Sequence, residues 1–354
     1  GIVAAHKKLH DRKFICKLDD LPDDVRAEVD SLVGYTIPWR TVVKESSIST
    51  PVRLVFDASS GTPGGESLNN ILAKGSNNLG SLLSILLQFR LKRHAFTADV
   101  SMAYNGVRLD QAHLCYQKFL WKQGMNELAP LEVWIILTLI YGIRSSGNQT
   151  TVGFNLLADF VLAHPELHQA DLGAIVLKFR AYMDDLLSSH DTAEEAARAA
   201  QELKYVLSLG SMGVKDITFN GSSPSELVST DEVHVGLLGM LWDSKNDVIK
   251  LDIGELYLGK RKRGKNPEII EDDLPGKLSK QFTRRVVVGK VASVYDPLGL
   301  LTPVTAKYKL QLHDLCGKKL DWDDKIPGEF LDTWVTNIEE IQTLGSIQFP
   351  RSVI

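Results

Sequence analysis

The chain has 354 residues, of which 44% are hydrophobic and 24% are charged, and its formal net charge is −4. This composition is that of a globular protein of about two or three domains, and it argues against a generally basic nucleic-acid coat while allowing a local basic groove. The three cysteines, Cys16, Cys115 and Cys316, form no CxxC pair, which excludes a disulfide framework and a cysteine zinc site and suits a reducing compartment.

No part of the sequence predicts a targeting or membrane segment. The longest apolar run, residues 133–143, is shorter than the stretch of about 20 residues that spans a bilayer. The amino-terminal residues GIVAAHKKLHDRK contain no apolar signal core, and the sequence does not begin with methionine. We therefore expect a piece of a longer open reading frame that has no membrane partner.

The first quarter of the chain carries alternating helix and strand signals. Pro22 and the two acidic residues after it indicate the start of a helix, and Gly34 indicates its stop. Between Arg40 and Asp57 the residues alternate as in strands, and a loop rich in Gly, Ser and Pro follows. Residues 79–93 place leucines at helical spacing and end in basic residues, which predicts an amphipathic helix packed on a sheet.

The middle of the chain carries most of the expected strands. AFTADV predicts a strand that ends at Asp99, and a tight turn is expected at Met183-Asp184-Asp185 between two apolar strands. In chain order, the further expected strands are Leu114–Trp121, Val133–Ile140, Ala174–Tyr182, Leu186–His190, Asp216–Asn220, Val233–Asp243 and Val248–Asp252, and the expected helices are Thr150–Ala163 and Thr192–Leu209. The second helix has a capping residue and acidic residues in its first turn.

After Gly254 the sequence changes character. Residues 258–290 hold ten Lys and Arg against four acidic residues, a local net charge of +6. Helical spacing is then expected over Phe282–Tyr295, Pro303–Leu320 and Phe330–Leu344. The sequence thus predicts an α+β fold, with an antiparallel-rich sheet and helices followed by a helical carboxy-terminal part.

The most informative feature is a set of carboxylates at the ends of apolar strands. Asp99 closes one strand, and Asp184 and Asp185 stand in a turn between two others. Aspartate is a favoured turn residue, so a single Asp-Asp turn has an ordinary structural explanation. Three converging carboxylates would repel one another unless divalent cations neutralised them. Two such cations, about 3.5–4 Å apart, are the apparatus of in-line phosphoryl transfer.

Here the sequence resembles a known family. Tyr182-Met183-Asp184-Asp185 resembles the YxDD motif of reverse transcriptases, and Thr97-Ala98-Asp99-Val100, with Tyr104 beyond it, resembles their first palm motif. The segments VRLVFDASS, SLNNIL, LLSILLQFRLKRHAFTADV, YMDDLL, TAEEA, LLGMLWD and VYDPLGLLTP resemble the polymerase region of BEL/Pao long-terminal-repeat retrotransposons. The resemblance covers about residues 36–345, and the 85 residues from Asp99 to Asp184 suit that fold.

The resemblance implies a right-hand polymerase with fingers, a palm built on an antiparallel sheet and a mostly helical thumb. The expected divisions are an amino-terminal extension (1–35), a fingers and palm domain (36–245), a basic connector (246–281) and a helical thumb or connection-like region (282–354). The implied activity is RNA-directed DNA polymerisation by two-metal nucleotidyl transfer. It would add deoxynucleotides to a primer 3′ end on an RNA or DNA template, with two Mg²⁺ or Mn²⁺ ions and a deoxynucleoside triphosphate substrate.

The resemblance also implies roles for individual residues. Asp99, Asp184 and Asp185 would form the catalytic, metal-binding triad, with Asp185 the more peripheral, and the backbone carbonyl of Val100 would complete one coordination sphere. Tyr104 would lie under the incoming sugar and exclude a 2′-hydroxyl, although a core aromatic is the alternative. Arg53 would lie against the triphosphate, a role that suits a planar and permanently charged guanidinium.

Further residues would contact the nucleotide and the nucleic acid. The expected nucleotide contacts are Gly142, Ser146, Gln149 and Met183, and many relatives have proline where this chain has Gly147. Val235–Trp242, with Gly239 and Trp242, resembles the primer-grip hairpin, for which a plain core strand is the alternative. Lys260, Arg261, Lys262 and Arg263 would neutralise duplex phosphates. A solvated loop or a localisation signal would explain the same four residues.

Two other functions compete with an active polymerase. A silent or domesticated retroelement fragment would bind nucleic acid without catalysis, and the lack of a recognisable RNase H or integrase portion favours it. A different two-metal enzyme, such as a nuclease, would leave Arg53 and Tyr104 unexplained. The partners expected for the polymerase are a template–primer duplex, deoxynucleoside triphosphates and other parts of a parent polyprotein. The expected location is a cytoplasmic retroelement particle, with the nucleus as the alternative.

Overall fold

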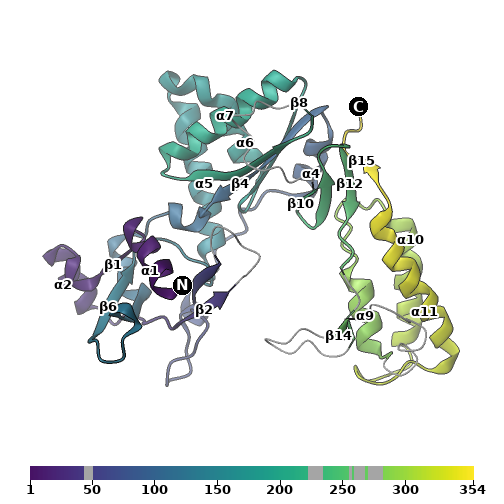
Figure 1. Cartoon of the computed structure of the whole chain (residues 1–354), viewed down its shortest axis with the longest axis horizontal. Coiled ribbons are helices and arrows are strands. Elements are labelled where there is room, and N and C mark those ends of the chain that lie inside the picture. The colour runs from purple at the N-terminus through teal and green to yellow at the C-terminus, as the bar shows by residue number, and fades with distance from the viewer. Residues whose placement is uncertain (44–50, 222–233, 255–256, 259–267, 270–281) are drawn as a thin grey trace. The chain divides into compact units, whose positions relative to one another are not determined.

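The computed structural model describes residues 1–43, 51–221, 234–254, 257–258, 268–269 and 282–354 (Figure 1). Helices and several small sheets make this a mixed α/β protein. The chain divides into two compact units. Unit 1 comprises residues 1–80, 98–186 and 198–216, and unit 2 comprises residues 81–97, 187–197 and 217–354. Among the described residues, every helix is too short or too polar to cross a bilayer.

A three-stranded antiparallel sheet organises the amino-terminal part of unit 1. Its order is β1-β6-β5, with β1 at Ile15–Lys17, β5 at Lys118–Lys122 and β6 at Leu131–Ile136. The strands β2 (Trp39–Val43) and β3 (Val52–Phe56) pair beside it as the expected alternating strands. The short helices of this part are α1 (Ile2–Asp11), η1 (Leu18–Asp20), α2 (Asp23–Ser31), α3 (Leu68–Ile71) and η4 (Gln123–Met125). Aromatic side chains from both sheets, Phe56, Phe119 and Trp121 among them, share one core.

The expected strand Leu114–Trp121 is wrong over its first half. Residues Gln111–Gln117 form the 3-10 helix η3, and the strand β5 begins only at Lys118. The carboxylate of Asp110 caps η3 by accepting a hydrogen bond from the backbone N–H of Ala112 at 3.0 Å. The apolar residues that suggested a strand, Leu114 and Cys115, instead pack against helix α2. A short apolar run is compatible with a strand or a helix, so the capping residue and the packing partner determine which of the two forms.

Helix α1 is held by an aromatic cluster around His6. The His6 ring stacks on Trp121 with centroids 3.9 Å apart and meets Trp134 edge-on at 4.3 Å. The side chain is 7% exposed, and in the part of the chain that the structure describes its Nε2 has no hydrogen-bond partner. Burial, together with the nearby His10, lowers the pKa of His6 to about 4. The neutral imidazole is therefore the form that the folded chain accommodates.

Replacing His6 by phenylalanine is expected to remove much of the stability loss that the wild type shows on acidification. An unfolded histidine titrates near pH 6.5, above the pKa of about 4 in the folded chain. The unfolded chain therefore binds the proton first as the pH falls, and stability is lost from about pH 6.5 down to about pH 4. At about 1.36 kcal/mol per pKa unit, the loss reaches about 3 kcal/mol.

Thermal unfolding followed by circular dichroism from neutral pH to about pH 4 measures this effect. His113→Phe is the matched control, because His113 is exposed on η3. The control is expected to retain the full acid-induced fall in unfolding temperature. An equal fall in His6→Phe and in the wild type would contradict the assignment to His6.

The helices of unit 1 correct a second strand prediction. Ala174–Tyr182 was expected to be a strand, but α6 spans Asp171–Phe179 and only Ala181–Tyr182 (β7) is extended. The buried residues of α6 include Gly173, Ala174 and Leu177, which share one face at helical spacing. The neighbouring helices are α5 (Ser146–Ala163), η5 (Pro165–Ala170) and α7 (Ala193–Leu209).

Glycine at position 173 lets α6 approach α7 closely. A Cβ atom there would lie 2.4 Å from the backbone of Glu202 and Leu203. The backbone N–H of Gly173 donates to the Glu202 carboxylate at 3.1 Å. The helical conformation of 171–179 is thus favoured by a contact with a helix about thirty residues further along the chain.

A four-stranded sheet, in the order β7-β8-β4-β9, carries the expected carboxylates. The strands are β4 (His94–Ser101), β8 (Asp185–His190) and β9 (Gly213–Phe219), together with β7. The expected strand through AFTADV is confirmed, but it ends at Ser101 and not at Asp99. The expected strand after the Asp-Asp turn is confirmed, and β9 begins three residues earlier than expected. β4, β8 and β9 each contribute residues to both units.

Unit 2 is built around helix α4 and a second four-stranded sheet. Helix α4 spans Leu82–Arg90. The sheet has the order β10-β11-β12-β15, with strands His234–Leu237, Met240–Asp243, Val248–Leu251 and Phe349–Pro350. The expected strand Val233–Asp243 is therefore a hairpin, because Leu238 and Gly239 both have positive φ and turn the chain. The two-residue strands β13 (Tyr257–Leu258) and β14 (Glu268–Ile269) pair separately.

The carboxy-terminal part of unit 2 contains the three expected helices. They are α9 (Arg284–Ser293), α10 (Thr302–Cys316) and α11 (Gly328–Thr343), which lie side by side (Figure 1) and are followed by η6 (Leu344–Ser346). The carboxylate of Asp296 accepts hydrogen bonds from the backbone N–H groups of Leu300 and Leu301, at 2.9 and 2.7 Å. Asp296 therefore orders the chain leading into α10.

Candidate functional site

The turn between β7 and β8 brings the expected carboxylates together. Tyr182 pairs with Asp185, so Met183 and Asp184 form a two-residue turn. The backbone N–H of Val100 donates to the backbone carbonyl of Asp184 at 2.9 Å. Asp184 is thereby fixed beside strand β4, next to the residue that follows Asp99. All three carboxylate residues lie in unit 1 and are partly buried.

Two of the three carboxylates, those of Asp99 and Asp185, are electrostatically perturbed. Burial, with the charges of Asp184 and Asp99, raises the pKa of Asp185 to about 6. Burial and the charge of Asp184 also raise the pKa of Asp99, and the Lys215 ammonium partly offsets that rise. Strongly perturbed carboxylates that act on one another are typical of functional sites. The cluster carries negative charge that a bound cation would stabilise.

The backbone is strained on both sides of this cluster. Met183 has φ of 58°, and Met102, which directly follows strand β4, has φ of 55°. This left-handed region is uncommon for residues other than glycine. Such conformations cost of order 1 kcal/mol or more and concentrate at functional sites. The turn conformation is therefore maintained by the packing around it.

Tyr104 lies against this turn. It belongs to the 3-10 helix η2 (Ala103–Gly106), is partly buried, and meets the ring of Tyr141 edge-on with centroids 4.3 Å apart. Burial and the charge of Asp184 raise the pKa of Tyr104. A small cavity is lined by Ala103, Tyr104, Gly147, Thr150, Met183 and Asp184. The expected gate residue thus shares a cavity with the expected catalytic turn.

Helix α5 begins at this cavity. A Cβ atom on Gly147 would lie 2.9 Å from the Met183 methyl group and 3.6 Å from the Tyr104 hydroxyl. The hydroxyls of Ser146 and Thr150 are buried and have no hydrogen-bond partner among the described residues. Glycine at position 147 therefore allows Met183 and Tyr104 to pack on the first turn of the helix.

The loop before α5 is joined to strand β3. Gly142 has φ of 97°, and a Cβ atom there would lie 2.6 Å from the Phe56 carbonyl oxygen. The Asn69 side-chain amide donates to the Gly142 carbonyl at 2.8 Å. Gln149 is exposed, and its amide donates to the Ser145 hydroxyl at 3.0 Å. Gly142, Ser146 and Gln149 thus lie at one helix start, but only Ser146 is buried.

Arg53 reaches the same region electrostatically. It is exposed on β3, opposite Val42 in the β2–β3 pairing. Its charge acts on Tyr141 and on Lys215. The expected triphosphate contact is therefore in electrostatic range of the residues around the carboxylate turn.

Three further residues of this site were not expected from the sequence. Tyr141 is 56% exposed, but desolvation of its hydroxyl and the charge of Asp184 raise its pKa to about 12. On β9, the Lys215 ammonium pairs with the Asp216 carboxylate, and both charges act on Asp99. Tyr141 directly precedes Gly142, an expected nucleotide contact, and this neighbourhood in the sequence was the one signal that could have identified it. Lys215 and Asp216 are an ordinary charged pair in sequence, so only the pairing of strands reveals them.

Gly239 and Trp242 lie in unit 2, on the β10–β11 hairpin. Gly239 has φ of 88°, and a Cβ atom there would lie 2.5 Å from the Tyr295 ring. Trp242 is fully buried, and its indole N–H donates to the Asp247 carboxylate at 3.0 Å. Gly239 is therefore at the hairpin tip, and Trp242 anchors the base of the hairpin.

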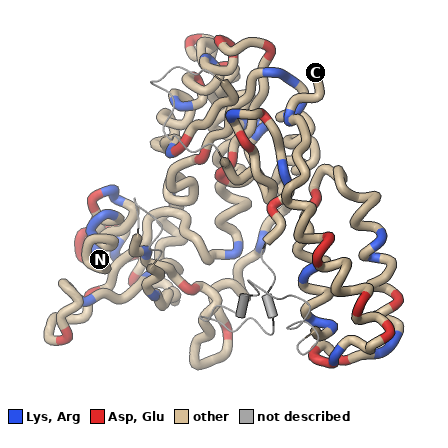
Figure 2. The backbone as a smooth tube through the Cα atoms, turned by 45° about the vertical axis from the view of Figure 1, so that its right-hand side comes forward, with Lys and Arg blue, Asp and Glu red and all other residues tan. Residues whose placement is uncertain are grey.

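The four expected phosphate contacts, Lys260, Arg261, Lys262 and Arg263, lie outside the described residues. The basic residues 265, 277 and 280 of the same stretch also lie outside them. The other three basic residues of the stretch 258–290 make contacts within the chain. Arg285 pairs with Asp323 at 2.9 Å, Lys290 donates to the Gly254 carbonyl at 2.5 Å, and Arg284 lies over the Trp322 ring. Along α9, α10 and α11 acidic and basic residues are interspersed (Figure 2).

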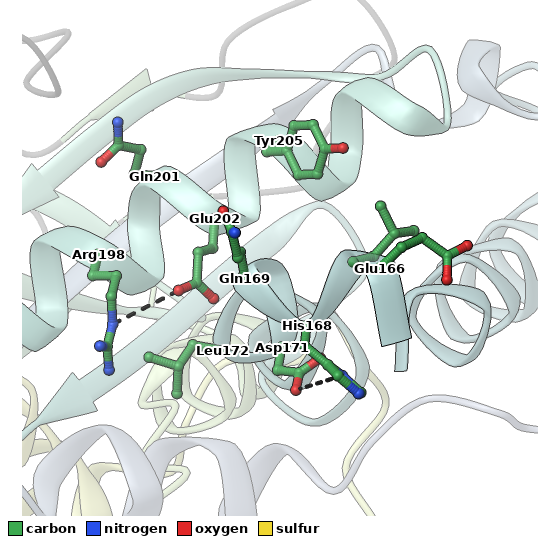
Figure 3. Close-up of a pocket in the computed structure, with 10 residues that line it drawn as sticks. Glu166, His168, Gln169, Asp171, Leu172, Arg198, Gln201, Glu202 and Tyr205 are labelled. Carbon is green, nitrogen blue, oxygen red and sulfur yellow. Dashed lines mark hydrogen bonds and ion pairs between the residues drawn. The ribbon is translucent and has the colours of Figure 1, made fainter. Parts of the chain in front are cut away.

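A separate open groove of about 740 Å³ lies in unit 1, between η5, α6 and α7 (Figure 3). It is lined by Glu166, Leu167, His168, Gln169, Asp171, Leu172, Arg198, Gln201, Glu202 and Tyr205. The Glu202 carboxylate lies 3.7 Å from the Arg198 guanidinium, and His168 lies 3.2 Å from Asp171. None of the expected site residues lines this groove.

The carboxylate turn is not an assembled metal cage. In the part of the chain that the structure describes, no group of three or more His, Cys, Asp or Glu side chains is arranged to hold a metal ion. The oxygen atoms of Asp99, Asp184 and Asp185 are nevertheless the donor type that hard divalent cations prefer.

Comparison with known proteins finds one family match in the carboxy-terminal part of the chain and a similarity in fold to one solved structure. Residues 283–354, about a fifth of the chain, match a family model described as the Pao retrotransposon-like RNaseH-like domain. The solved structure of the foamy viral protease-reverse transcriptase dRH in complex with double-stranded DNA is similar, with a TM-score of 0.53 and 14% sequence identity. The similarity covers 96% of this chain and 46% of that one, so this chain spans about half its length. No curated protein matches.

The family match corrects one expectation. A lack of any recognisable RNase H portion was expected, but the helical region after residue 282 matches a family described as RNaseH-like. All of its residues from 283 to 354 are described, and they form α9, α10, α11, η6 and the short strand β15. Short catalytic motifs do not reveal a similarity of this kind, because it extends over residues 283–354 as a whole. At 14% identity, the structural similarity shows the fold alone.

Proposed function

We propose that the chain is an RNA-directed DNA polymerase that adds deoxynucleotides to the 3′ end of a primer. One observation carries the proposal: the Met183-Asp184 turn is hydrogen-bonded to Val100, so the carboxylates at the ends of two strands lie together. The raised pKa values of Asp99 and Asp185, to which burial and the charge of Asp184 contribute at both residues, support it. So does the similarity in fold to a protein named as a protease-reverse transcriptase.

Asp99, Asp184 and Asp185 would hold two Mg²⁺ or Mn²⁺ ions, with the Val100 carbonyl as a further ligand. The donor set fits, because carboxylates that repel one another are stabilised by hard cations. When bound, such ions supply positive charge that lowers the pKa of the primer hydroxyl and stabilises the leaving pyrophosphate. The residues of the chain would orient the primer hydroxyl for in-line attack on the α-phosphate.

The other residues of the site would select and hold the nucleotide. The Tyr104 ring, fixed by its contact with Tyr141, would occupy the space of a 2′-hydroxyl. Arg53 would bind the triphosphate with its fixed positive charge. The first turn of α5, including Ser146 and Gln149, would contact the nucleotide or template next to Met183. Each of these residues belongs to unit 1.

A template–primer duplex is the proposed macromolecular partner. The similar solved structure is that of a complex with double-stranded DNA. The hairpin tip at Gly239 would hold the primer end, and Lys260, Arg261, Lys262 and Arg263 would neutralise duplex phosphates. A retroelement particle in the cytoplasm is the proposed location, and other parts of a parent polyprotein are proposed partners.

A silent nucleic-acid-binding fragment is the second candidate. The observation that favours it is the lack of an assembled three-ligand metal site among the described residues. This candidate predicts duplex binding without any dependence of activity on divalent cations. A nuclease would not require deoxynucleoside triphosphates. The position of Tyr104 in the cavity beside the turn, and the reach of the Arg53 charge to Tyr141 and Lys215, favour a nucleotide substrate.

Primer extension on a poly(rA)–oligo(dT) duplex, with dTTP and Mg²⁺ or Mn²⁺, tests the proposed function. We expect extension that EDTA abolishes and that an excess of Mg²⁺ restores. A folded chain that binds the duplex in a salt-sensitive manner but does not extend the primer would identify the silent fragment. A folded chain that does neither would contradict both candidates.

A further inference from the structure

The side chain of Arg351, three residues before Ile354, is completely buried. A guanidinium has five N–H donors, and all five are used here. Nε and one terminal nitrogen donate to the two Asp247 carboxylate oxygens at 2.6 and 2.8 Å. The remaining three N–H groups donate to the backbone carbonyls of Phe89, Lys92 and Arg93, at 2.6, 2.8 and 2.7 Å. No other side chain of the amino-acid set reproduces this fork.

The Asp247 carboxylate joins Arg351 to the β10–β11 hairpin. One oxygen also accepts the indole N–H of Trp242 at 3.0 Å, and the other accepts the side-chain amide of Asn220 at 3.0 Å. Asp247 occupies the left-handed region, with φ of 53°, in the turn between β11 and β12. The hairpin base is thus bonded to a carboxylate whose charge only Arg351 neutralises directly among the described contacts.

The same network reaches the carbonyl end of helix α4 and the start of strand β4. Of the three backbone carbonyls that Arg351 binds, that of Phe89 belongs to the last turn of α4, and those of Lys92 and Arg93 follow the helix. Carbonyls in the last turn of a helix have no hydrogen-bond partner within the helix. Asn220 bonds the backbone of Ala95 through both its side-chain oxygen and its own N–H, at 2.7 and 3.1 Å. Phe89 packs edge-on against Trp242, with ring centroids 5.2 Å apart. Every one of these residues lies in unit 2.

We infer that Arg351 is a positioning residue for the β10–β11 hairpin. The strand β15 places it, through the pairing of Phe349 with Ile249 and of Pro350 with Val248. Arg351 then fixes Asp247, and Asp247 fixes Trp242 at the hairpin base, four residues from the Leu238-Gly239 tip. If the proposed function holds, the carboxy-terminal strand β15 sets the position of the primer 3′ end without touching it. This step rests on the proposed function.

Hydrogen exchange in the full chain tests the positioning directly. In Arg351→Met, amides of β10, β11 and β12 are expected to exchange about tenfold faster or more, while those of α5 and α6 change by less than about twofold. Arg285→Met is the matched control, because Arg285 also pairs with an aspartate in unit 2 but is exposed. This control should leave the hairpin amides unchanged. Arg351→Lys, which keeps the charge but loses the fork, should lie between Arg351→Met and the wild type.

The double variant Asp247→Asn/Arg351→Met guards against simple unfolding. It removes both charges, so it should fold where Arg351→Met is unstable, and it should still show faster exchange of the hairpin. Equal acceleration throughout the chain in the double variant would reduce Arg351 to a stability element and overturn the inference. Unchanged exchange of the hairpin would overturn it equally.

Primer extension adds the functional readout. Arg351→Met, or the double variant if it alone folds, is expected to lower kcat for dTTP incorporation about tenfold, with the duplex dissociation constant within about twofold of the wild type. A proportionate loss of duplex affinity, or an equal loss in Arg285→Met, would contradict the positioning of the primer end. If the wild type itself does not extend a primer, the proposed function fails, and the exchange experiment alone decides the positioning of the hairpin.

Discussion

Replacing Asp184 by asparagine is expected to lower the rate of primer extension about a thousandfold while leaving the chain folded. Asparagine has nearly the same shape, and the hydrogen bond from Val100 goes to the backbone carbonyl of residue 184, so the turn survives. What is lost is one negative charge at the centre of the cluster. Removing that charge should also lower the pKa of Asp185, because the charge of Asp184 is one of the causes that raise it.

Single-turnover extension of a labelled primer measures the rate of the variant and the wild type. Asp191→Asn is the matched control, since Asp191 directly follows β8 and its exposed carboxylate pairs with Lys92 at 2.7 Å. The control is expected to extend at the wild-type rate to within about twofold. A variant of Asp184 that keeps more than about a tenth of the activity would refute its role as a principal metal ligand.

Replacing Tyr104 by alanine is expected to lower the preference for dTTP over UTP about a hundredfold. The Tyr104 ring is held in place by its edge-on contact with Tyr141 at 4.3 Å and shares a cavity with Met183 and Asp184. Removing the ring opens space for a 2′-hydroxyl, so UTP should gain while dTTP is affected less. The ratio of kcat/KM for the two nucleotides, on the same primer and template, measures the effect.

Tyr104→Phe separates the ring from its hydroxyl. Because the proposed exclusion is steric, the phenylalanine variant should keep the wild-type preference to within about threefold. If the two variants lose the preference equally, the hydroxyl rather than the ring is responsible. An unchanged preference in Tyr104→Ala would identify Tyr104 as a core aromatic, which is the alternative that the sequence leaves open.

Much of the candidate site was predictable because signals within a few residues of the sequence determine the strands and the turn that carry its residues. The turn at Met183-Asp184 is confirmed, since apolar residues on both sides and Asp in the turn are local signals. The strand through Asp99 and the helix α7 likewise follow from alternation and from capping within a few residues. The roles of these residues in catalysis stay predictions, because they depend on chemistry that a fold does not establish.

The errors have a common physical origin in short apolar segments. Residues 174–179 form a helix because Gly173 lets α6 approach α7, and residues 114–117 form a 3-10 helix because Leu114 and Cys115 pack on α2. In both segments the apolar pattern alone suits a strand equally well. The packing partner that decides lies about thirty residues away in the first example and about ninety in the second.

By itself, the sequence determined the order of the carboxylates, the turn that presents two of them, and most of the helices and strands. Only the tertiary structure decided that Tyr141 and Lys215 join the carboxylate cluster, and that Arg351 binds Asp247, 104 residues earlier in the chain. The physical reason is the distance along the chain over which each interaction acts. Capping, turn chemistry and periodicity act over a few residues, whereas the neutralisation of a buried charge depends on whichever group the completed fold places beside it.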